Sequence, residues 1–363
     1  MLWFSVVVGP AVILALWSLR GERKRAEYVA AGMTALDEPP APSLPPVTII
    51  VPVMRSTPEL AETLRFLAAQ DYPDFELIVV APGADFLGPG VLPTIVKVTL
   101  AGVGGRTTLL QAGIRAARRG AEVFAFGAPS GQVSARWLRA LVAPLADPRV
   151  GAATAFRWYT PDPPTFWSLV RSAWNAVIAG RFGPGATDFV WDGAMAITKA
   201  SFFAARLQEC RTDLTVAVRD AHLLIAFAPG AMVACPGRVT AREFLAQAGC
   251  EMSQARRHYP RLWWSALVSH IIYCGAMLAA VIAIASGNRG AEWAIVVLFG
   301  LGMLKGANRA TLAKAQLPDW KTWFDRYSWT TTFWVPLATW IWLYILISSL
   351  RQIKEPKSLW NKL

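Results

Sequence analysis

The chain has 363 residues, of which 54% are hydrophobic, and its mean hydropathy is positive. This composition excludes an ordinary soluble domain and predicts membrane segments. The formal net charge is +12, but the basic residues border apolar runs and form no stripe interleaved with aromatic residues. The charge therefore indicates contact with anionic headgroups at the cytoplasmic face of a membrane, and argues against nucleic acid as a partner.

The first apolar run predicts an N-terminal transmembrane helix over residues 1–20, since residues 2–19 are long enough to span a bilayer. Basic residues follow this run, which places the N-terminus outside and the remainder of the chain inside. The next segment, 21–46, is basic and ends rich in proline, and it predicts an extended linker.

Residues 47–237 alternate between apolar strand-like runs and amphipathic helical stretches. Examples are the strand-like "VTIIVPV" and "EVFAFGA", with the helical "PELAETLRFLAAQ" after the first of them. This alternation predicts an α/β domain with a mostly parallel sheet covered by helices on both faces. Ligands of such sheets bind beyond the carboxyl ends of the strands.

The C-terminal third predicts an amphipathic interfacial helix at 238–261 and membrane helices within 262–350, with a basic interfacial segment at 305–328. If every apolar run crossed the bilayer, the basic tail 351–363 would lie outside, against the positive-inside rule. We therefore predict that the run 329–350, which contains an internal proline, does not cross simply.

Several segments carry a resemblance to a known family. They are "VTIIVPVMRSTPELAETLRFLAAQDYPDFELIVV", "GRTTLLQAG", "VSARWLRALVAPLADPRVGAATAFRWY", "FVWDGAMAITKASF" and "FAPGAMVACPGRVTAREFLAQ". Together they resemble glycosyltransferase family 2, and most closely its membrane-bound branch of ceramide glucosyltransferase-like and hopanoid-associated lipid glycosyltransferases. The resemblance implies a GT-A fold, which is a Rossmann-like α/β domain, and transfer of a sugar from a nucleotide sugar to a lipid hydroxyl.

The metal motif of that family, Asp-x-Asp, falls on Ala128, Pro129 and Ser130 when the flanking residues fix the register. Neither carboxylate is present, and a serine hydroxyl is a poor ligand for Mg²⁺ or Mn²⁺. We expect no cofactor; Mg²⁺ or Mn²⁺ is expected only if the protein is active. This degenerate motif is the main sequence argument for impaired catalysis.

The resemblance also assigns candidate site residues. Those on the nucleotide side are Pro52, Asp85, Arg106 and Gln111, and those on the acceptor side are Asp192 and Gly193. For Asp85, a solvated loop residue is the favoured interpretation. The candidate catalytic base is Asp213, which could also simply cap a helix.

The last family motif, Gln-x-x-Arg-Trp, falls on Gln247, Cys250 and Glu251, so its glutamine is kept and its cation is lost. We interpret the chain as a catalytically impaired relative that binds a membrane lipid or holds other membrane protein subunits. The alternative is an active lipid glycosyltransferase with a non-standard site, which would bind a nucleotide sugar. A transporter or channel subunit is disfavoured because intramembrane charges are scarce.

Overall fold

The computed structural model describes residues 2–39, 43–55, 57–87, 93–102, 105–185, 187, 189–207, 214–288 and 290–351. In these residues a seven-stranded sheet has the order β3-β2-β1-β4-β7-β5-β8, and β6 pairs with β9 in a small parallel sheet. The strands are β1 Val47–Pro52, β2 Phe75–Ala81, β3 Val96–Leu100, β4 Val123–Gly127, β5 Val150–Thr154, β6 Arg157–Tyr159, β7 Ala194–Thr198, β8 Leu224–Phe227 and β9 Val233–Cys235.

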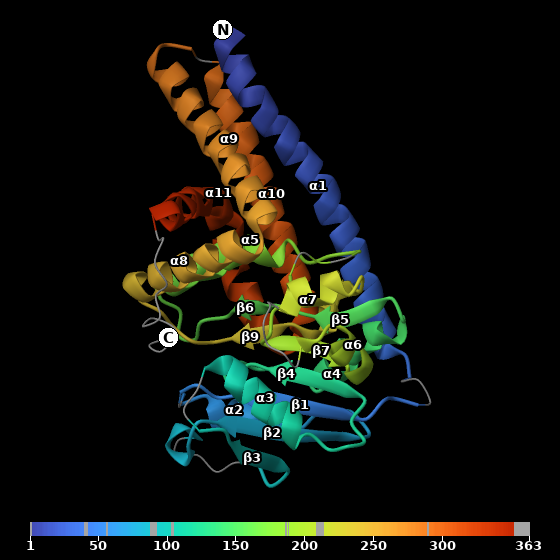
Figure 1. The fold of residues 1–363 in the computed structure, drawn as a ribbon. Coiled ribbons are helices and arrows are strands. Elements are labelled where there is room, and N and C mark those ends of the chain that lie inside the picture. Colours follow the sequence, from blue (N-terminus) through green and yellow to red (C-terminus); the bar gives the residue numbers. More distant parts are fainter. Residues whose placement is uncertain are drawn as a thin grey trace.

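Helices surround this sheet and extend from it as a bundle (Figure 1). The shorter ones are α2 Leu60–Ala68, α3 Arg106–Ala116, α4 Trp137–Val142, α5 Phe166–Ala179, α6 Lys199–Ala204, α7 Leu214–Asp220 and α8 Ala241–His258. The long ones are α1 Leu2–Asp37, α9 Pro260–Ala285, α10 Ala291–Gln316 and α11 Lys321–Arg351. By length and composition, the described residues contain four helices able to cross a membrane, one from each of these long helices.

The sheet forms because its strands are apolar on both faces. Every residue of β1 and β4 is buried, as is typical of parallel strands that are covered by helices on both sides. The strand β7 runs antiparallel to β4 and to β5, with Gly127 opposite Ala194 and Thr154 opposite Met195. The carboxyl ends of β4 and β5 therefore meet the amino end of β7 at one edge of the sheet. The predicted α/β architecture is confirmed.

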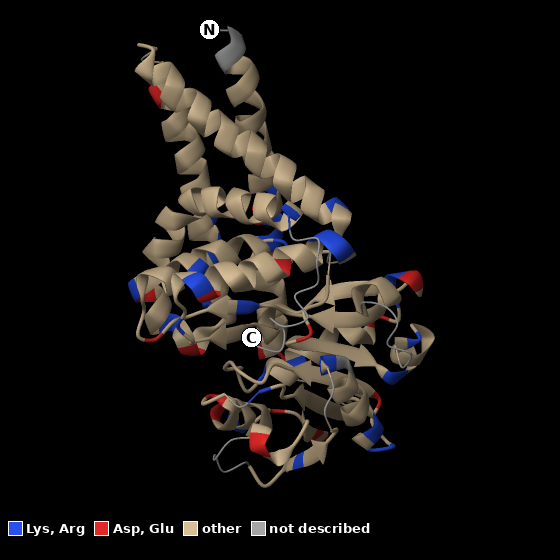
Figure 2. Ribbon diagram, turned by 60° about the vertical axis from the view of Figure 1, so that its left-hand side comes forward, with Lys and Arg blue, Asp and Glu red and all other residues tan. Residues whose placement is uncertain are grey.

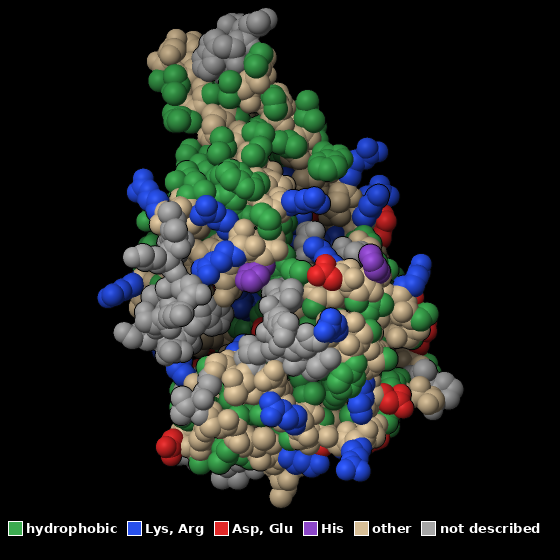
Figure 3. All heavy atoms as spheres, viewed as in Figure 1, with side chains coloured by type: hydrophobic (Ala, Val, Ile, Leu, Met, Phe, Trp, Pro, Cys, Tyr) green, Lys and Arg blue, Asp and Glu red, His purple; other side chains and the backbone are tan. Residues whose placement is uncertain are grey.

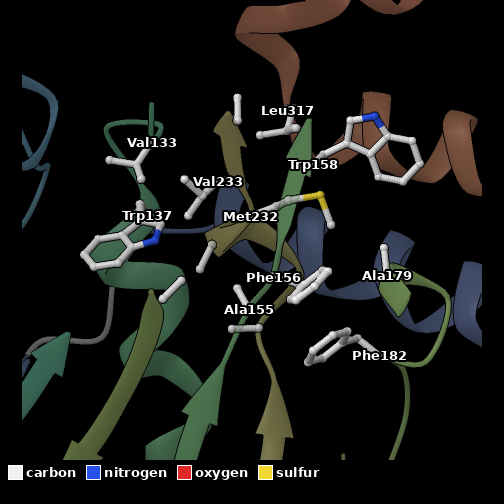
Figure 4. Packing of buried hydrophobic residues seen from close by; sticks show 14 of the residues in the cluster. Val133, Trp137, Ala155, Phe156, Trp158, Ala179, Phe182, Met232, Val233 and Leu317 are labelled. Atoms are coloured by element: carbon white, nitrogen blue, oxygen red, sulfur yellow. The ribbon is translucent and has the colours of Figure 1, made fainter. Parts of the chain in front are cut away.

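One hydrophobic core joins the sheet to the long helices. Figure 4 shows Phe156 facing Phe182, and their rings stack with centroids 5.0 Å apart. On the helical side, Trp174 of α5 stacks on Trp342 of α11 at 4.8 Å. Because aromatic rings bury large areas and pack in defined geometries, these contacts fix the helices against the α/β part.

The first helix corrects the expected linker at 21–46. The helix α1 continues to Asp37, so only the residues beyond it connect to β1. The physical reason is burial: Val29 and Leu36 lie in the core, and the Tyr28 hydroxyl donates to the carbonyl of Phe227 at 2.7 Å. The basic half of α1 is thus docked along the α/β part.

The C-terminal elements lie near the predicted boundaries. The interfacial segment 238–261 contains α8, which Thr240 and Glu243 begin with a reciprocal capping box. Figure 1 shows α1, α9 and α10 extending together, while the end of α11 lies beside α5 and α8. Arg256 of α8 donates to the carbonyls of Ser349 and Leu350, both at 3.1 Å. This placement favours the prediction that 329–350 does not cross simply, which stays a prediction.

Charge is segregated along the bundle. Figure 3 shows hydrophobic side chains covering its outer part, with Lys and Arg side chains gathered around its base next to the α/β part. Figure 2 shows the same separation on the ribbon. This pattern matches an apolar segment within a bilayer and a basic belt at one face.

Candidate functional site

A cavity of about 880 Å³ lies between the carboxyl edge of the sheet and the long helices. Its volume is typical of a ligand site. Polar residues gather where it meets the α/β part: Arg106, Gln111, Arg157, Asp192 and Glu251. Toward the bundle it is lined by residues of four long helices, among them Ser18, Ala266, Ser269, His270, Arg309 and Trp342. The cavity thus connects the strand ends to the part of the chain expected in the membrane.

An ion pair between Arg106 and Asp192 lies at the α/β end of this cavity. Arg106 is the first residue of α3, and Asp192 precedes β7 by two positions. The Nε atom of Arg106 donates to Oδ2 of Asp192 at 2.6 Å. The next residue is Gly193, and a Cβ there would lie 2.3 Å from the ring of Trp191, so a larger residue would displace that ring. That ring lines the cavity.

A second ion pair joins Arg157 of β6 to Glu251 of α8. Gln247 supports it, since its Nε2 donates to the Tyr159 hydroxyl at 2.7 Å and to Oε1 of Glu251 at 3.0 Å. Burial raises the pKa of Tyr159 to about 12, so this phenol stays protonated at neutral pH. Burial is the largest single effect on Arg157 and lowers its pKa, but the attraction and hydrogen bond of Glu251, together with smaller effects of Tyr159 and Cys235, outweigh it, and the pKa is raised. The phenol therefore stays neutral and the guanidinium stays charged across the physiological pH range.

The degenerate metal motif lies apart from this cavity. The backbone N–H of Ala128 donates to the carbonyl of Gly193 at 2.9 Å, which places it at the carboxyl end of β4 as predicted. Ala128 and Ser130 line a separate space of about 10 Å³, room for no more than one water, walled by Leu67 and Trp137. Gln247 lines neither this space nor the large cavity, so neither of them brings it together with Ala128 and Ser130.

The residues at this position do not fit Mg²⁺ or Mn²⁺. An alanine methyl group and one exposed serine hydroxyl supply no charged oxygen, which such ions require. Among the described residues, no group of three or more His, Cys, Asp or Glu side chains is placed to hold a metal ion.

The remaining predicted residues are scattered. Pro52 is buried at the end of β1, and Asp85 is exposed in the short turn η1 Ala84–Leu87. Neither lines the large cavity, whereas Gln111 does. Asp213 lies outside the described residues. The residue after it, Leu214, begins α7 and lines the cavity.

Arg157, Tyr159 and Arg171 were missed by the sequence analysis. The guanidinium centre of Arg171 lies 3.8 Å from the centroid of the Tyr159 ring, which is within the range of a cation–π contact. The sequence signal for them was the run "FRWY" after a buried strand, because an arginine at a strand end within an apolar run needs a partner. That partner, Glu251, is 94 residues away in the chain.

Comparison with known proteins supports the fold and part of the resemblance. A family model described as glycosyl transferase family 21 matches residues 4–85. This match bears out the ceramide glucosyltransferase-like part of the resemblance over those residues, through family 21 and not family 2. No curated protein matches the chain.

Two solved structures are similar to this chain. One is the mannosyltransferase PcManGT from Pyrobaculum calidifontis in complex with GDP-Man and Mn²⁺, with 15% identity and a TM-score of 0.50, covering 94% of this chain and 99% of that chain. The other is GalNAc-T7 with UDP, GalNAc and Mn²⁺, with 13% identity and a TM-score of 0.42, covering 55% of this chain and 45% of that chain. The chain therefore has a GT-A-like α/β fold joined to long apolar helices, and its residues 4–85 match glycosyl transferase family 21.

Proposed function

We propose that this glycosyltransferase-like protein binds an amphiphilic membrane lipid in the large cavity and does not carry out metal-dependent sugar transfer. The observation that carries the proposal is the continuity of the cavity from Arg106 and Asp192 to His270 and Trp342. A lipid headgroup fits the polar end and its chains fit between the helices. The lipid then stands where an acceptor would.

We expect no metal-dependent transfer because the positions that would neutralise a nucleotide diphosphate lack the required charged groups. A departing nucleotide diphosphate needs positive charge in the transition state, and losing one such partner costs about 2.7–4 kcal/mol. The motif positions hold Ala128 and Ser130, and the site of the family's arginine holds Cys250. We further propose that the α/β part is cytoplasmic, because the basic belt surrounds the end of the bundle that faces it (Figure 3).

Native mass spectrometry of the protein in nanodiscs tests lipid binding. We expect a retained lipid in the wild type and its loss in Ala266→Trp, which fills the cavity from α9. The matched control is Leu278→Trp on the exposed face of the same helix, and it should retain the lipid. Equal retention by both variants would contradict the proposal.

A second candidate function is active, metal-independent transfer to a lipid. It is favoured by Arg106 and Arg157, which both line the cavity and could neutralise a diphosphate without a metal. The test is radiolabelled transfer from a uridine diphosphate sugar to a lipid extract. Robust transfer by the wild type that is abolished by Asp213→Asn would show an active transferase and would contradict the proposal of a lipid-binding protein with impaired catalysis.

A further inference from the structure

The polar end of the cavity contains two carboxylates that the resemblance does not lead one to expect. By the resemblance described above, Glu251 stands where the last family motif has tryptophan, and Asp192 stands at a position where that family is expected to have glycine. Each carboxylate binds a cavity arginine: Asp192 binds Arg106 with an N–O distance of 2.6 Å, and Glu251 binds Arg157. Both departures therefore add a negative charge beside a cation that could otherwise bind phosphate.

The ion pair of Arg157 and Glu251 is well placed to persist. The side chains of Arg157 and Glu251 are 15% and 22% exposed, so water screens their attraction little. The guanidinium of Arg157 also lies 5.3 to 5.5 Å from the ring centroids of Phe156, Tyr159 and Trp191, which restricts where it can move. Glu251 is held in turn by Gln247. A diphosphate could reach Arg157 only by displacing this carboxylate or by lying beside it.

The two pairs leave these four side chains with no net charge. A nucleotide diphosphate would have to be desolvated next to two carboxylates, and like charges at short range repel strongly. An uncharged headgroup meets no such penalty. It finds paired donors and acceptors, to which hydroxyl groups can hydrogen-bond, beside Trp191, which also lines the cavity.

We propose that Asp192 and Glu251 act as internal counter-ions that exclude nucleotide diphosphates from the cavity and select a lipid with an uncharged, hydroxyl-bearing headgroup. The lipid part of this inference rests on the proposed function, and the exclusion part does not. The two carboxylates are specificity-determining residues. They act on binding and require no catalysis.

The test is the affinity of metal-free UDP for the full chain, measured calorimetrically in detergent. The variants are Asp192→Asn, Glu251→Gln and the double variant, which keep side-chain shape and remove the charge. We expect each single variant to bind UDP about tenfold more tightly than the wild type, with a larger gain in the double variant and no need for Mn²⁺. Asp74→Asn, which breaks the Asp74–Arg118 pair on the surface, should change nothing.

The charge-conserving variants Asp192→Glu and Glu251→Asp keep the counter-ion and should bind UDP as weakly as the wild type. They also show whether a gain in UDP affinity results from the lost charge or from looser packing of the cavity. Unchanged UDP affinity in folded Asp192→Asn and Glu251→Gln, as judged by their melting curves, overturns the exclusion. Native mass spectrometry of the same samples distinguishes failure of the exclusion from failure of lipid binding. If the wild type retains a lipid but the variants do not gain affinity for UDP, only the exclusion is rejected. If the wild type retains no lipid, the proposed function is rejected.

Discussion

Arg157 shows how one residue on a short strand can organise a site. It pairs with Glu251, lies among aromatic rings, and comes directly after the two residues that leave β5. The position that the resemblance reserves for a cation holds Cys250, which is buried. The cation that pairs with Glu251 in this cavity therefore comes from β6 and not from the helix α8.

Removing Arg157 should destabilise the protein more than removing a surface arginine. The variant Arg157→Leu leaves Glu251 as an uncompensated, largely buried charge, and we expect a loss of about 3 kcal/mol in unfolding free energy. Arg149→Leu, which breaks an exposed pair with Asp147, should reduce the unfolding free energy much less. Denaturant titration in micelles measures both.

The loss of unfolding free energy in Arg157→Leu should be smaller when the charge of Glu251 is also removed. Arg157→Leu combined with Glu251→Leu is expected to be more stable than Arg157→Leu alone, because no charge is then left buried without a partner. A double variant no more stable than the single one would show that Arg157 acts through packing and not through its charge.

Manganese should not affect nucleotide-sugar binding by the wild type. Ala128 and Ser130 offer no carboxylate, and the space beside them is about 10 Å³. Calorimetric titration with a uridine diphosphate sugar should give the same affinity with Mn²⁺ and with a chelator. The variant carrying Ala128→Asp, Ser130→Asp, Cys250→Arg and Glu251→Trp rebuilds the family motifs, and we expect Mn²⁺ to strengthen its binding. A clear Mn²⁺ effect in the wild type would contradict the expectation.

At the scale of elements, the close crossing of α10 and α11 depends on small residues. A Cβ on Gly306 would lie 2.8 Å from the carbonyl oxygen of Thr331 and 2.9 Å from the Cα of Thr332. These atoms belong to the backbone of α11 and cannot move without shifting the helix. Small residues at helix interfaces commonly allow such close approach in membranes.

Gly306→Ala should therefore separate the two helices and reduce the unfolding free energy by about 1–3 kcal/mol. Gly300 lies on the same helix, and a Cβ added there would meet nothing within 4 Å, so Gly300→Ala is the matched control. The control should be neutral or slightly stabilising, by at most about 1 kcal/mol, since alanine favours helices. Micelle unfolding curves compare them, and equal stability of the two variants would rule out a tight crossing.

Sequence patterns predicted the elements that are determined by residues adjacent in the chain. The strands Val47–Pro52 and Val123–Gly127 were predictable because fully apolar runs form buried parallel strands. The helical state of residues 21–37 was not, because a basic, mixed segment becomes a helix only through its contacts with the α/β part. The Arg157–Glu251 pair could not be predicted either, since its two residues are 94 positions apart and meet only when α8 packs against β6.

At the scale of the whole molecule, the arrangement separates an apolar bundle from a polar α/β part. The turn between α9 and α10 and the start of α1 lie at the far end of the bundle (Figure 1). The end of α11 lies at its base, beside α8. The two ends of the bundle should therefore face opposite sides of the membrane.

Cysteine labelling in sealed vesicles tests this arrangement. In a background without the native cysteines, Glu292→Cys at the start of α10 should react with an impermeant reagent from outside. Arg351→Cys at the end of α11 should react only after the vesicles are opened. Both residues are exposed, so access is not limited by packing. Labelling of Arg351→Cys from outside would mean that the run 329–350 crosses the bilayer.

The continuous helix α1 ties the cavity to the bilayer itself. With 36 residues it is about 54 Å long, well beyond the roughly 30 Å of a hydrocarbon core. Ser18, near its middle, lines the cavity, and Tyr28 fixes its far half to the α/β part. A bilayer that is thinner or thicker than the apolar length of a helix changes the tilt of that helix. Because α1 is one helix that both lines the cavity and packs on the α/β part, a change in its tilt should move Ser18 relative to the other walls, and we expect membrane thickness to change the width of the cavity.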